Sequence, residues 1–513
     1  MMTNLLRWLA LLAMMLCLAP AWAASDRHVF FVSDLHVGAG KEGKKWKQVE
    51  DFRWQADFDS FLDWAGGQPG PGTDMVFVGD TFELWQSPTM VCSGDFSNPQ
   101  CRIDDCNEAH SERGCTEDEA LARFEHVLNA HPDFVDAVRR FAGKGRNRVF
   151  FIPGNHDAAL LFPKVRARLL RPFQGQPVSV MRAGYWISAD GAILSDHGHQ
   201  FDDLNTFKDW PAPFVTNDGV QRLRKPWGEN MVQQFYNQYE FVFPIVDNLS
   251  DEMTGINYAL EQANRSQKVV AMRKLFRFLL WQQSTRQAGI LLGDPGKAPV
   301  WDHTKVKEQP PAFFVEALKK QPELYAAATE ALANGGLEFD PKALSEEDID
   351  AICITKSKIE GATECPTTGQ LGAIYKNWAL GREKLEVMYL TQELPRLPRR
   401  PGPVALYVFA HTHSAFEPTP LSLGEMKGGS VTLKHANTGA FQRVASPPQI
   451  AAILAKPEMA GRTVLDLQPE DLPACYNAIW VKPYQATPDA TLVRWSKSGD
   501  GAFAASTGPC LGQ

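Results

Sequence analysis

Five short apolar runs, rich in Val, Ile and Phe, each stop at a group of polar residues. Such runs predict buried strands that deliver the following side chains to their carboxyl ends. With their polar ends, the runs cover 28–36, 75–80, 148–157, 192–197 and 404–413. Between the early runs, apolar residues recur at helical spacing at 58–65 and 134–141. Because these helices alternate with strands, the pattern predicts an α/β protein built on a layered sheet.

The pattern changes between the fourth and fifth runs, where the chain becomes rich in amphipathic helix, for example at 269–280. We therefore divide the chain after residue 23 into three parts: a first core part at 24–204, a mainly helical insertion or cap at 205–400, and a second core part at 401–513. Closely spaced prolines at 395–403 predict an extended linker at the exit of the insertion. Beyond it, the strands predicted for a second sheet are 431–433, 463–467 and 479–482.

The amino terminus has the three parts of a secretory signal peptide at residues 1–23. They are a cation at Arg7, an apolar run at 8–18 and the small-residue pattern at 21–23. The apolar run is too short to span a membrane, and no later stretch is both long and free of charge. Leu16 precedes Cys17 where a lipoprotein signal carries a small residue, which argues against lipidation. We expect a periplasmic or secreted protein without a transmembrane segment.

The composition of the 513 residues is that of a globular protein, with 44% hydrophobic and 22% charged residues. These values exclude a disordered, collagenous or coiled-coil chain. The formal net charge of -8 argues against long nucleic acid as a partner and against a polybasic membrane surface. Local positive charge must therefore receive any anionic substrate. The sequence does not indicate the oligomeric state.

Eight cysteines remain after Cys17, an even number that suits disulfides in an oxidising compartment. Four of them lie in a polar loop at 86–118, and the sequence leaves their three possible pairings open: Cys92, Cys101, Cys106 and Cys115. A zinc knot is the alternative, although the loop has no C-x-x-C spacing. Proximity alone suggests the further pairs Cys353–Cys365 and Cys475–Cys510.

The polar ends of the five runs supply seven candidate metal ligands, all oxygen or imidazole donors. They are Asp34, His36, Asp80, Asn155, His197, His411 and His413. Alternation along a strand puts Asp34 and His36 on one side, so that this pair can contact a common centre. One ion takes four to six such donors, so seven predict two ions that share a bridge. Asp80 is the natural bridge because a carboxylate offers two oxygens and negative charge. A single D-x-H or G-D motif would carry no weight, since each occurs often by chance.

The order of these motifs, D-x-H, G-D, G-N-H-D, H and H-x-H, resembles the calcineurin-like metallophosphoesterase superfamily over residues 34 to 413. The resemblance implies a β-sandwich flanked by helices, here with a large and mainly helical insertion. It further implies two ligand sets: one of Asp34, His36, Asp80 and His413, and one of Asp80, Asn155, His197 and His411. Ala410 stands where the last motif of the family usually begins with glycine.

A weaker similarity, at 33–36 and 79–85, is to the branch that contains UDP-2,3-diacylglucosamine pyrophosphohydrolases. That branch acts on a cytosolic lipid A precursor and typically has arginine where this chain has His156. Because the signal peptide predicts export, we do not transfer its substrate.

The expected activity is hydrolysis of a small organic phosphate ester by a metal-bridging hydroxide. His156 would protonate the leaving oxygen as general acid, and Asp157 would orient its imidazole. Asp, Asn and His donors suit Mn, Fe and Zn alike, so the ions are two divalent or mixed-valence metals of unassigned identity. The alternatives are a phosphodiesterase or nuclease of the same fold, and a non-catalytic metal-binding scaffold.

Other residues near the motifs have both a functional and a structural explanation. His199 lies either next to the metal ligands or simply beside Gly198. Four lysines could attract a phosphate or form only a solvated loop: Lys41, Lys44, Lys45 and Lys47. Three tryptophans could stack on a substrate ring, although packing is the simpler explanation: Trp46, Trp54 and Trp85.

Overall fold

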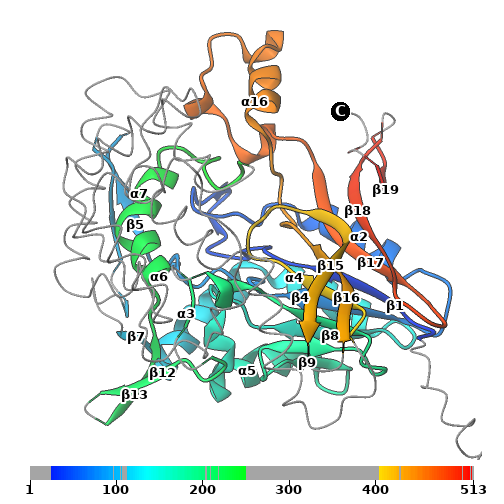
Figure 1. The fold of residues 1–513 in the computed structure, drawn as a ribbon. Helices are drawn as coiled ribbons and strands as arrows, with labels where there is room; N and C mark the ends of the chain where they lie inside the picture. The colour runs from blue at the N-terminus through cyan, green and yellow to red at the C-terminus, as the bar shows by residue number, and fades with distance from the viewer. Residues whose placement is uncertain are drawn as a thin grey trace, which may run out of the picture.

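The computed structural model describes residues 25–249 and 404–510, except for 96–97, 104, 107–112, 203–204, 208–209, 218, 427–428, 499–500 and 509. The predicted signal peptide, most of the predicted insertion, the linker at 395–403 and the pair Cys353–Cys365 lie outside these residues. The described chain has mixed α/β content with several sheets, which confirms the general fold class predicted from the sequence. Figure 1 shows the arrangement of the elements.

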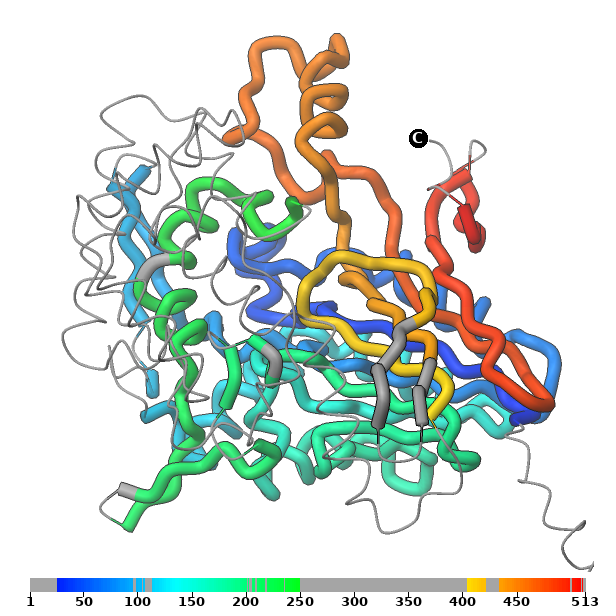
Figure 2. Tube along the Cα trace, in the orientation of Figure 1, coloured from blue at the N-terminus to red at the C-terminus, as the bar shows by residue number. Residues whose placement is uncertain are grey.

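One sheet has seven strands and contains three of the predicted runs. Its parallel strands are β1 (His28–Val32), β4 (Thr73–Val78), β8 (Arg148–Ile152) and β9 (Val178–Val180). On the other side of β1 the sheet continues antiparallel with β17 (Cys475–Lys482), β18 (Asp489–Lys497) and β19 (Phe503–Ser506). The first and last parts of the chain therefore lie side by side (Figure 2).

A second sheet has five strands and contains the other two predicted runs. Its order is β10 (Tyr185–Ile187), β11 (Ile193–Asp196), β14 (Leu406–Phe409), β16 (Gly429–Asn437) and β15 (Phe416–Met426). Strands β11, β14 and β16 are parallel, so β11 and β14 end at the same edge. The predicted strand at 431–433 is part of β16, whereas the one at 479–482 is part of β17 and joins the seven-stranded sheet.

The predicted strand at 463–467 is wrong, because this segment forms the 3-10 helix η9 (Val464–Asp466). Thr463 and Asp466 form a capping box in which each side chain accepts a hydrogen bond from the backbone of the other residue. Local capping therefore overrides the apolar character that suggested a strand.

The two sheets pack face to face, and helices cover the opposite face of the larger sheet. Alternate residues of β1 divide between the two cores: Val29 and Phe31 pack against Ile193 and Val408 of the second sheet. Phe30 belongs to the other core. That core contains residues of α2 (Gln55–Ala65), α3 (Glu117–Ala130), α4 (Pro132–Ala142) and α5 (Pro163–Leu170). The helices predicted at 58–65 and 134–141 are thus confirmed as α2 and α4.

A third apolar cluster joins the start of the predicted insertion to the second core part. It contains Tyr239 and Phe243 from the region of α6 (Trp227–Met231) and α7 (Asn237–Glu240). Its other side is formed by α16 (Pro447–Leu454), through Ile450 and Ile453. Residues 227–249 are therefore packed onto the core.

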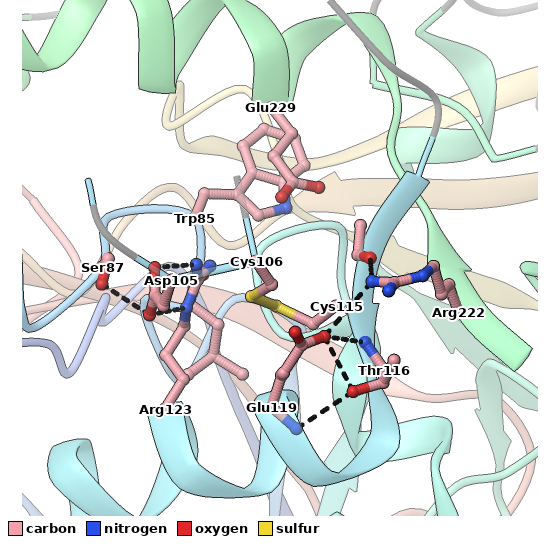
Figure 3. Close-up of a disulfide and its surroundings, with 12 residues drawn as sticks. Trp85, Ser87, Asp105, Cys106, Cys115, Thr116, Glu119, Arg123, Arg222 and Glu229 are labelled. Carbon is pink, nitrogen blue, oxygen red and sulfur yellow. Dashed lines mark hydrogen bonds and ion pairs between the residues drawn. A yellow bond between two sulfur atoms is a disulfide. The ribbon is translucent and has the colours of Figure 1, made fainter. Parts of the chain in front are cut away.

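Disulfides fix the Cys-rich loop. Cys92 pairs with Cys101 across the hairpin of β5 (Val91–Ser93) and β6 (Gln100–Arg102), and Cys106 pairs with Cys115 of β7 (Arg113–Thr116). Beside the second disulfide, Arg123 of α3 donates hydrogen bonds to Asp105 (Figure 3). The predicted pair Cys475–Cys510 is confirmed.

Strand β7 continues into a small sheet with β13 (Val220–Arg224) and β12 (Phe214–Asn217). A further hairpin consists of β2 (Lys41–Glu42) and β3 (Lys45–Trp46). Among the described residues, no helix is long and apolar enough to cross a membrane.

Candidate metal centre

The predicted donors lie just beyond the carboxyl ends of five strands, three from one sheet and two from the other. Asp34 and His36 follow β1, and Asp80 follows β4. Backbone hydrogen bonds tie these ends together: Asp34 donates to the carbonyl of Gly79 and His36 to that of Asp80. In the second sheet, Ala410 donates to the carbonyl of His197. The loops that carry the donors are thus fixed to one another.

Five of the seven predicted ligands have a left-handed backbone conformation. These five are Asp34, His36, Asp80, His411 and His413, with φ angles between 47° and 72°. No other non-glycine residue of the described chain has a positive φ. This conformation costs about 1–3 kcal/mol for a residue with a Cβ atom and clusters at functional sites. Its restriction to predicted ligands shows that the local backbone is shaped around the position of these side chains.

One group of ligand atoms belongs to Asp34, His36 and His413, and these atoms lie within 4.8 Å of one another. His413 Nε2 is 3.3 Å from Asp34 Oδ1, and His36 Nε2 is 4.0 Å from the same oxygen. Asp34 is fully buried, and burial on its own would raise the pKa of its carboxyl group, but the charge of His413 lowers that pKa.

A second group consists of Asp80, His197 and His411, also within 4.8 Å of one another. His197 Nε2 lies 2.9 Å from Asp80 Oδ2 and 3.0 Å from Asn155 Oδ1, so Asn155 joins this group. His197 Nδ1 donates to the carbonyl of Val78 at 2.7 Å, which directs Nε2 towards Asp80.

Burial and charge act in opposite directions on the Asp80–His197 pair. Burial on its own would raise the pKa of Asp80, but His197 and His156 hold it well below its usual value. Burial would lower the pKa of His197, but Asp80 raises it to about 9. In the absence of metal the pair is therefore ionic at neutral pH.

Two glycines allow the close approach of the strand ends. A Cβ atom on Gly79, whose φ is 81°, would lie 2.3 Å from the His197 ring. A Cβ atom on Gly154 would lie 2.2 Å from Asp80 Oδ1. Side chains of the centre itself therefore leave no room for a Cβ atom at the glycines of the G-D and G-N-H-D motifs.

Sequence reasoning missed Glu83, whose buried carboxylate connects two histidines. Glu83 Oε2 lies 3.1 Å from His36 Nδ1 and 2.5 Å from His156 Nδ1, while Oε1 accepts hydrogen bonds from the backbone amides of Trp85 and Gln86. Burial would raise the pKa of Glu83, but His156 holds it far below its usual value. The signals in the sequence are its place shortly after Asp80 and within the segment 79–85 that carries the weaker similarity.

Asp157 has different contacts from those predicted. Its carboxylate accepts hydrogen bonds from the backbone amides of Gly154, Thr81 and Phe82, and thus joins the loops after β8 and β4. Burial, followed by the charge of Asp80, raises its pKa to about 7. Glu83 therefore contacts the His156 imidazole and can orient it, whereas Asp157 fixes the two loops to each other.

Residues outside the predicted set hold the donors of the second sheet. Asp202 Oδ2 lies 3.1 Å from His411 Nε2. Asn437 of β16 donates to the carbonyl of Ala410 at 3.0 Å and to the hydroxyl of Thr412 at 3.1 Å, which fixes the backbone between the two histidines. Sequence patterns gave no indication of these residues.

His199 and the three candidate tryptophans pack against different partners. His199 packs edge-on against Trp210, and burial together with the charge of His197 keeps its pKa well below the usual value. Trp85 stacks on His156 with ring centroids 4.0 Å apart, whereas Trp54 packs in the helix-side core. Trp46 stacks at 6.2 Å on the His131 ring.

Two of the four lysines of the β2–β3 region have partners within the protein. Lys47 donates to the carbonyl of Pro88 at 2.6 Å, and Lys41 lies over the ring of Trp46. Lys44 and Lys45 are exposed. The structure thus gives two of the four lysines intramolecular contacts, and three of the four, including Lys41, are exposed to solvent.

The donor set fits metal ions. Both carboxylate oxygens of Asp34 and Nε2 of His36 are buried, and the described residues offer them no donor other than His413 Nε2, 3.3 Å from Asp34 Oδ1. A buried carboxylate with so few donors is costly unless a cation compensates it. Carboxylate, amide and imidazole donors without cysteine suit Zn, Fe or Mn. The residues that could hold one ion are Asp34, His36 and His413, and those for the other are Asp80, Asn155, His197 and His411.

Comparison with known proteins gave no relative, since the chain matches no family model, no curated protein and no solved structure.

Proposed function

We propose that the protein is an exported phosphoesterase with a dinuclear metal centre, which hydrolyses a small organic phosphate ester. The observation that carries the proposal is the meeting of two donor groups, Asp34–His36–His413 and Asp80–His197–His411, at the ends of strands from both sheets. The motif order that resembles the calcineurin-like metallophosphoesterase superfamily supports the same activity. The three disulfides in the described part of the chain suit the oxidising compartment that the proposed export implies.

Asp80 is the residue that would bridge the two ions. Its carboxylate interacts electrostatically with His36 of the first group and with His197 of the second. Asp80 Oδ1 also accepts a hydrogen bond from the backbone amide of His156 at 2.8 Å, which restricts the orientation of the carboxylate. When bound, two such ions neutralise phosphate charge and make a water molecule acidic enough to attack at neutral pH.

The residues of the chain would then supply orientation and a proton. Glu83 stabilises the charged imidazole of His156 through Nδ1, so that Nε2 can protonate the leaving oxygen. Trp85 stacks on the same ring and restricts its rotation. His36 is held through Nδ1 by the other contact to Glu83, which leaves its Nε2 as the atom that would bind the first ion.

Turnover of chromogenic phosphate esters by the full-length protein tests the proposal. We expect hydrolysis of a monoester that is lost on treatment with a strong chelator and is restored by Mn²⁺, Fe²⁺ or Zn²⁺. The matching diester is the comparison substrate, because preference for it would replace the monoesterase by a phosphodiesterase. Metal-loaded protein that binds two ions but hydrolyses neither ester would refute the enzymatic proposal.

A further inference from the structure

Three carboxylates outside the histidine-rich centre meet from separate segments of the chain. Asp51 lies in the loop before α2, Glu240 ends α7, and Asp247 lies in the turn that follows. One oxygen of each lies within 4.8 Å of the others, and Asp51 and Glu240 are 6% and 1% exposed. Like charges in this arrangement repel one another strongly, since burial weakens screening by water.

An amide side chain also points into this acidic cluster of Asp51, Glu240 and Asp247. Gln86, only 3% exposed, donates from Nε2 to Glu240 Oε2 at 2.5 Å. Its Oε1 atom is buried and has no hydrogen-bond partner among the described residues, and the same is true of Glu240 Oε1. Buried oxygens without partners are uncommon in folded proteins, and a bound cation or water molecule would satisfy the two oxygens.

The nearby cation does not compensate the cluster. Arg53 is the positive group that acts on both Asp51 and Glu240, but its guanidinium contacts Glu470 and the backbone carbonyl of Glu50. Burial, followed by the charge of Asp247, raises the pKa of both Asp51 and Glu240 well above the usual range. Glu83 and Glu50 add further negative charge to Asp51. The cluster therefore needs a bound cation or retained protons.

We propose that Asp51, Glu240, Asp247 and the Oε1 atom of Gln86 bind one Ca²⁺ ion. Ca²⁺ takes oxygen ligands at about 2.3–2.6 Å, so two ligands of one ion lie at most about 5 Å apart, as these carboxylates do. The set contains oxygen donors alone, unlike the histidine-rich centre, and therefore selects a hard cation. The ligands come from loops and a helix end, so their arrangement around an ion would be irregular. This favours Ca²⁺ over Mg²⁺, because Mg²⁺ demands a near-ideal octahedron.

The ion would join two parts of the molecule. Asp51 belongs to the first core part, whereas Glu240 and Asp247 belong to the start of the insertion. Gln86 follows the loop that carries Glu83. Bound Ca²⁺ thus fastens residues 240–247 to the core next to the loop that orients His156. This inference does not depend on the proposed phosphoesterase activity.

Thermal unfolding of the full-length protein with and without Ca²⁺ tests the site. After removal of Ca²⁺ with a Ca²⁺-selective chelator, we expect 1 mM CaCl₂ to raise Tm by about 3 °C or more. Isothermal titration with CaCl₂ should show one ion per chain. Glu240→Gln and Asp247→Asn should abolish the Tm shift, whereas Asp118→Asn, at an exposed carboxylate on α3, should retain it.

Two further variants and one further cation separate the alternatives. His197→Ala should keep the response to Ca²⁺, since it alters only the histidine-rich centre. A response that disappears in His197→Ala but persists in Glu240→Gln would overturn the proposal. The proposal would also be overturned if CaCl₂ left the Tm of the wild type unchanged while the Glu240→Gln substitution raised the Tm. Protons would then compensate the cluster. A shift with MgCl₂ as large as that with CaCl₂ would overturn the assignment to Ca²⁺.

Discussion

Glu83 holds the Nδ1 atom of His156 at 2.5 Å and, with the same oxygen, the Nδ1 atom of His36 at 3.1 Å. One buried carboxylate thus orients a predicted metal ligand and the predicted general acid together. Displacement of Glu83 is therefore expected to affect metal binding and proton transfer at once. Partners of this kind typically contribute 10- to 100-fold to metal affinity or activity, as an order of magnitude.

Glu83→Gln should lower kcat by about 10- to 100-fold and shift its pH profile. Loss of the negative charge destabilises the imidazolium of His156, so the alkaline limb of the kcat profile should move to lower pH. The profile is measured with metal-saturated protein. Glu125→Gln, at a half-exposed carboxylate paired with Arg168, is the matched control and should behave as wild type. An unchanged profile in Glu83→Gln would remove Glu83 from the proposed proton transfer.

Asp80→Ala and His156→Ala should separate metal binding from proton transfer. Asp80 belongs to the second donor group and interacts electrostatically with His36 of the first, so its removal should reduce both the content of bound metal and the turnover. His156→Ala should retain the metals and lower kcat by about 100- to 10,000-fold. Elemental analysis together with kcat checks both. Equal loss of metal in the two variants would contradict this division of roles.

Gly79→Ala should destabilise the protein more than an alanine at an unconstrained glycine. The new Cβ atom would meet the His197 ring at 2.3 Å in a backbone conformation with φ of 81°. We expect the free energy of unfolding to fall by about 2–5 kcal/mol. Gly145→Ala, with φ of 61° and no atom within 4 Å of its Cβ position, should cost only about 1 kcal/mol. Denaturant titration compares the two, and equal losses would show that contact with His197 does not matter.

Metal affinity should rise with pH between 7 and 9. Without metal, Asp80 raises the pKa of His197 to about 9, so His197 is protonated at pH 7 and must lose this proton to become a ligand. Release of one proton makes affinity increase about tenfold per pH unit below the pKa, and the increase should level off above it. Competition with a chelator of known affinity at several pH values measures the slope. A flat profile from pH 7 to 9 would contradict the protonated state of His197.

The same ion pair gives the metal-free protein a pH-dependent stability. Because the folded pKa of His197 lies above its unfolded value of 6.5, the pair stabilises the fold fully below pH 6.5, and the stabilisation is lost as pH rises through about 9. The free energy of unfolding of metal-free protein should therefore decrease between pH 7 and 10. In His197→Gln this decrease should be absent, and its persistence would assign the effect to another group.

The strand ends were predictable because each apolar run is local and stops at the polar residues that follow it. Residues 28–32 and 148–152 form β1 and β8 as the runs indicate. The pairing of β1 with β17 was not predictable, since about 450 residues separate them and no local pattern records the partner of a strand. The 3-10 helix at Val464–Asp466 was misread, although its Thr463–Asp466 capping box is visible in the sequence.

Within the candidate centre, the sequence indicated residues that stand directly at strand ends and missed those that support them. Glu83 contacts His36 and His156, and Asn437 contacts Ala410 and Thr412, the residues on either side of His411. Their roles depend on side-chain direction in loops, which hydrophobic periodicity does not encode. The role predicted for Asp157 failed for the same reason, because its carboxylate turns to backbone amides and not to the adjacent ring.

The position of β14 between β11 and β16 determines when the centre can form during biosynthesis. His411 and His413 complete the two donor groups, yet they are synthesised more than two hundred residues after His197. A nascent chain that ends before β14 has Asp34, His36, Asp80, Asn155 and His197, but it lacks His413 of the first group and His411 of the second, so neither group is complete. If the proposed centre binds metal, both ions can be held only after the chain has been synthesised through His413, and a chain terminated before β14 would lack a ligand of each group.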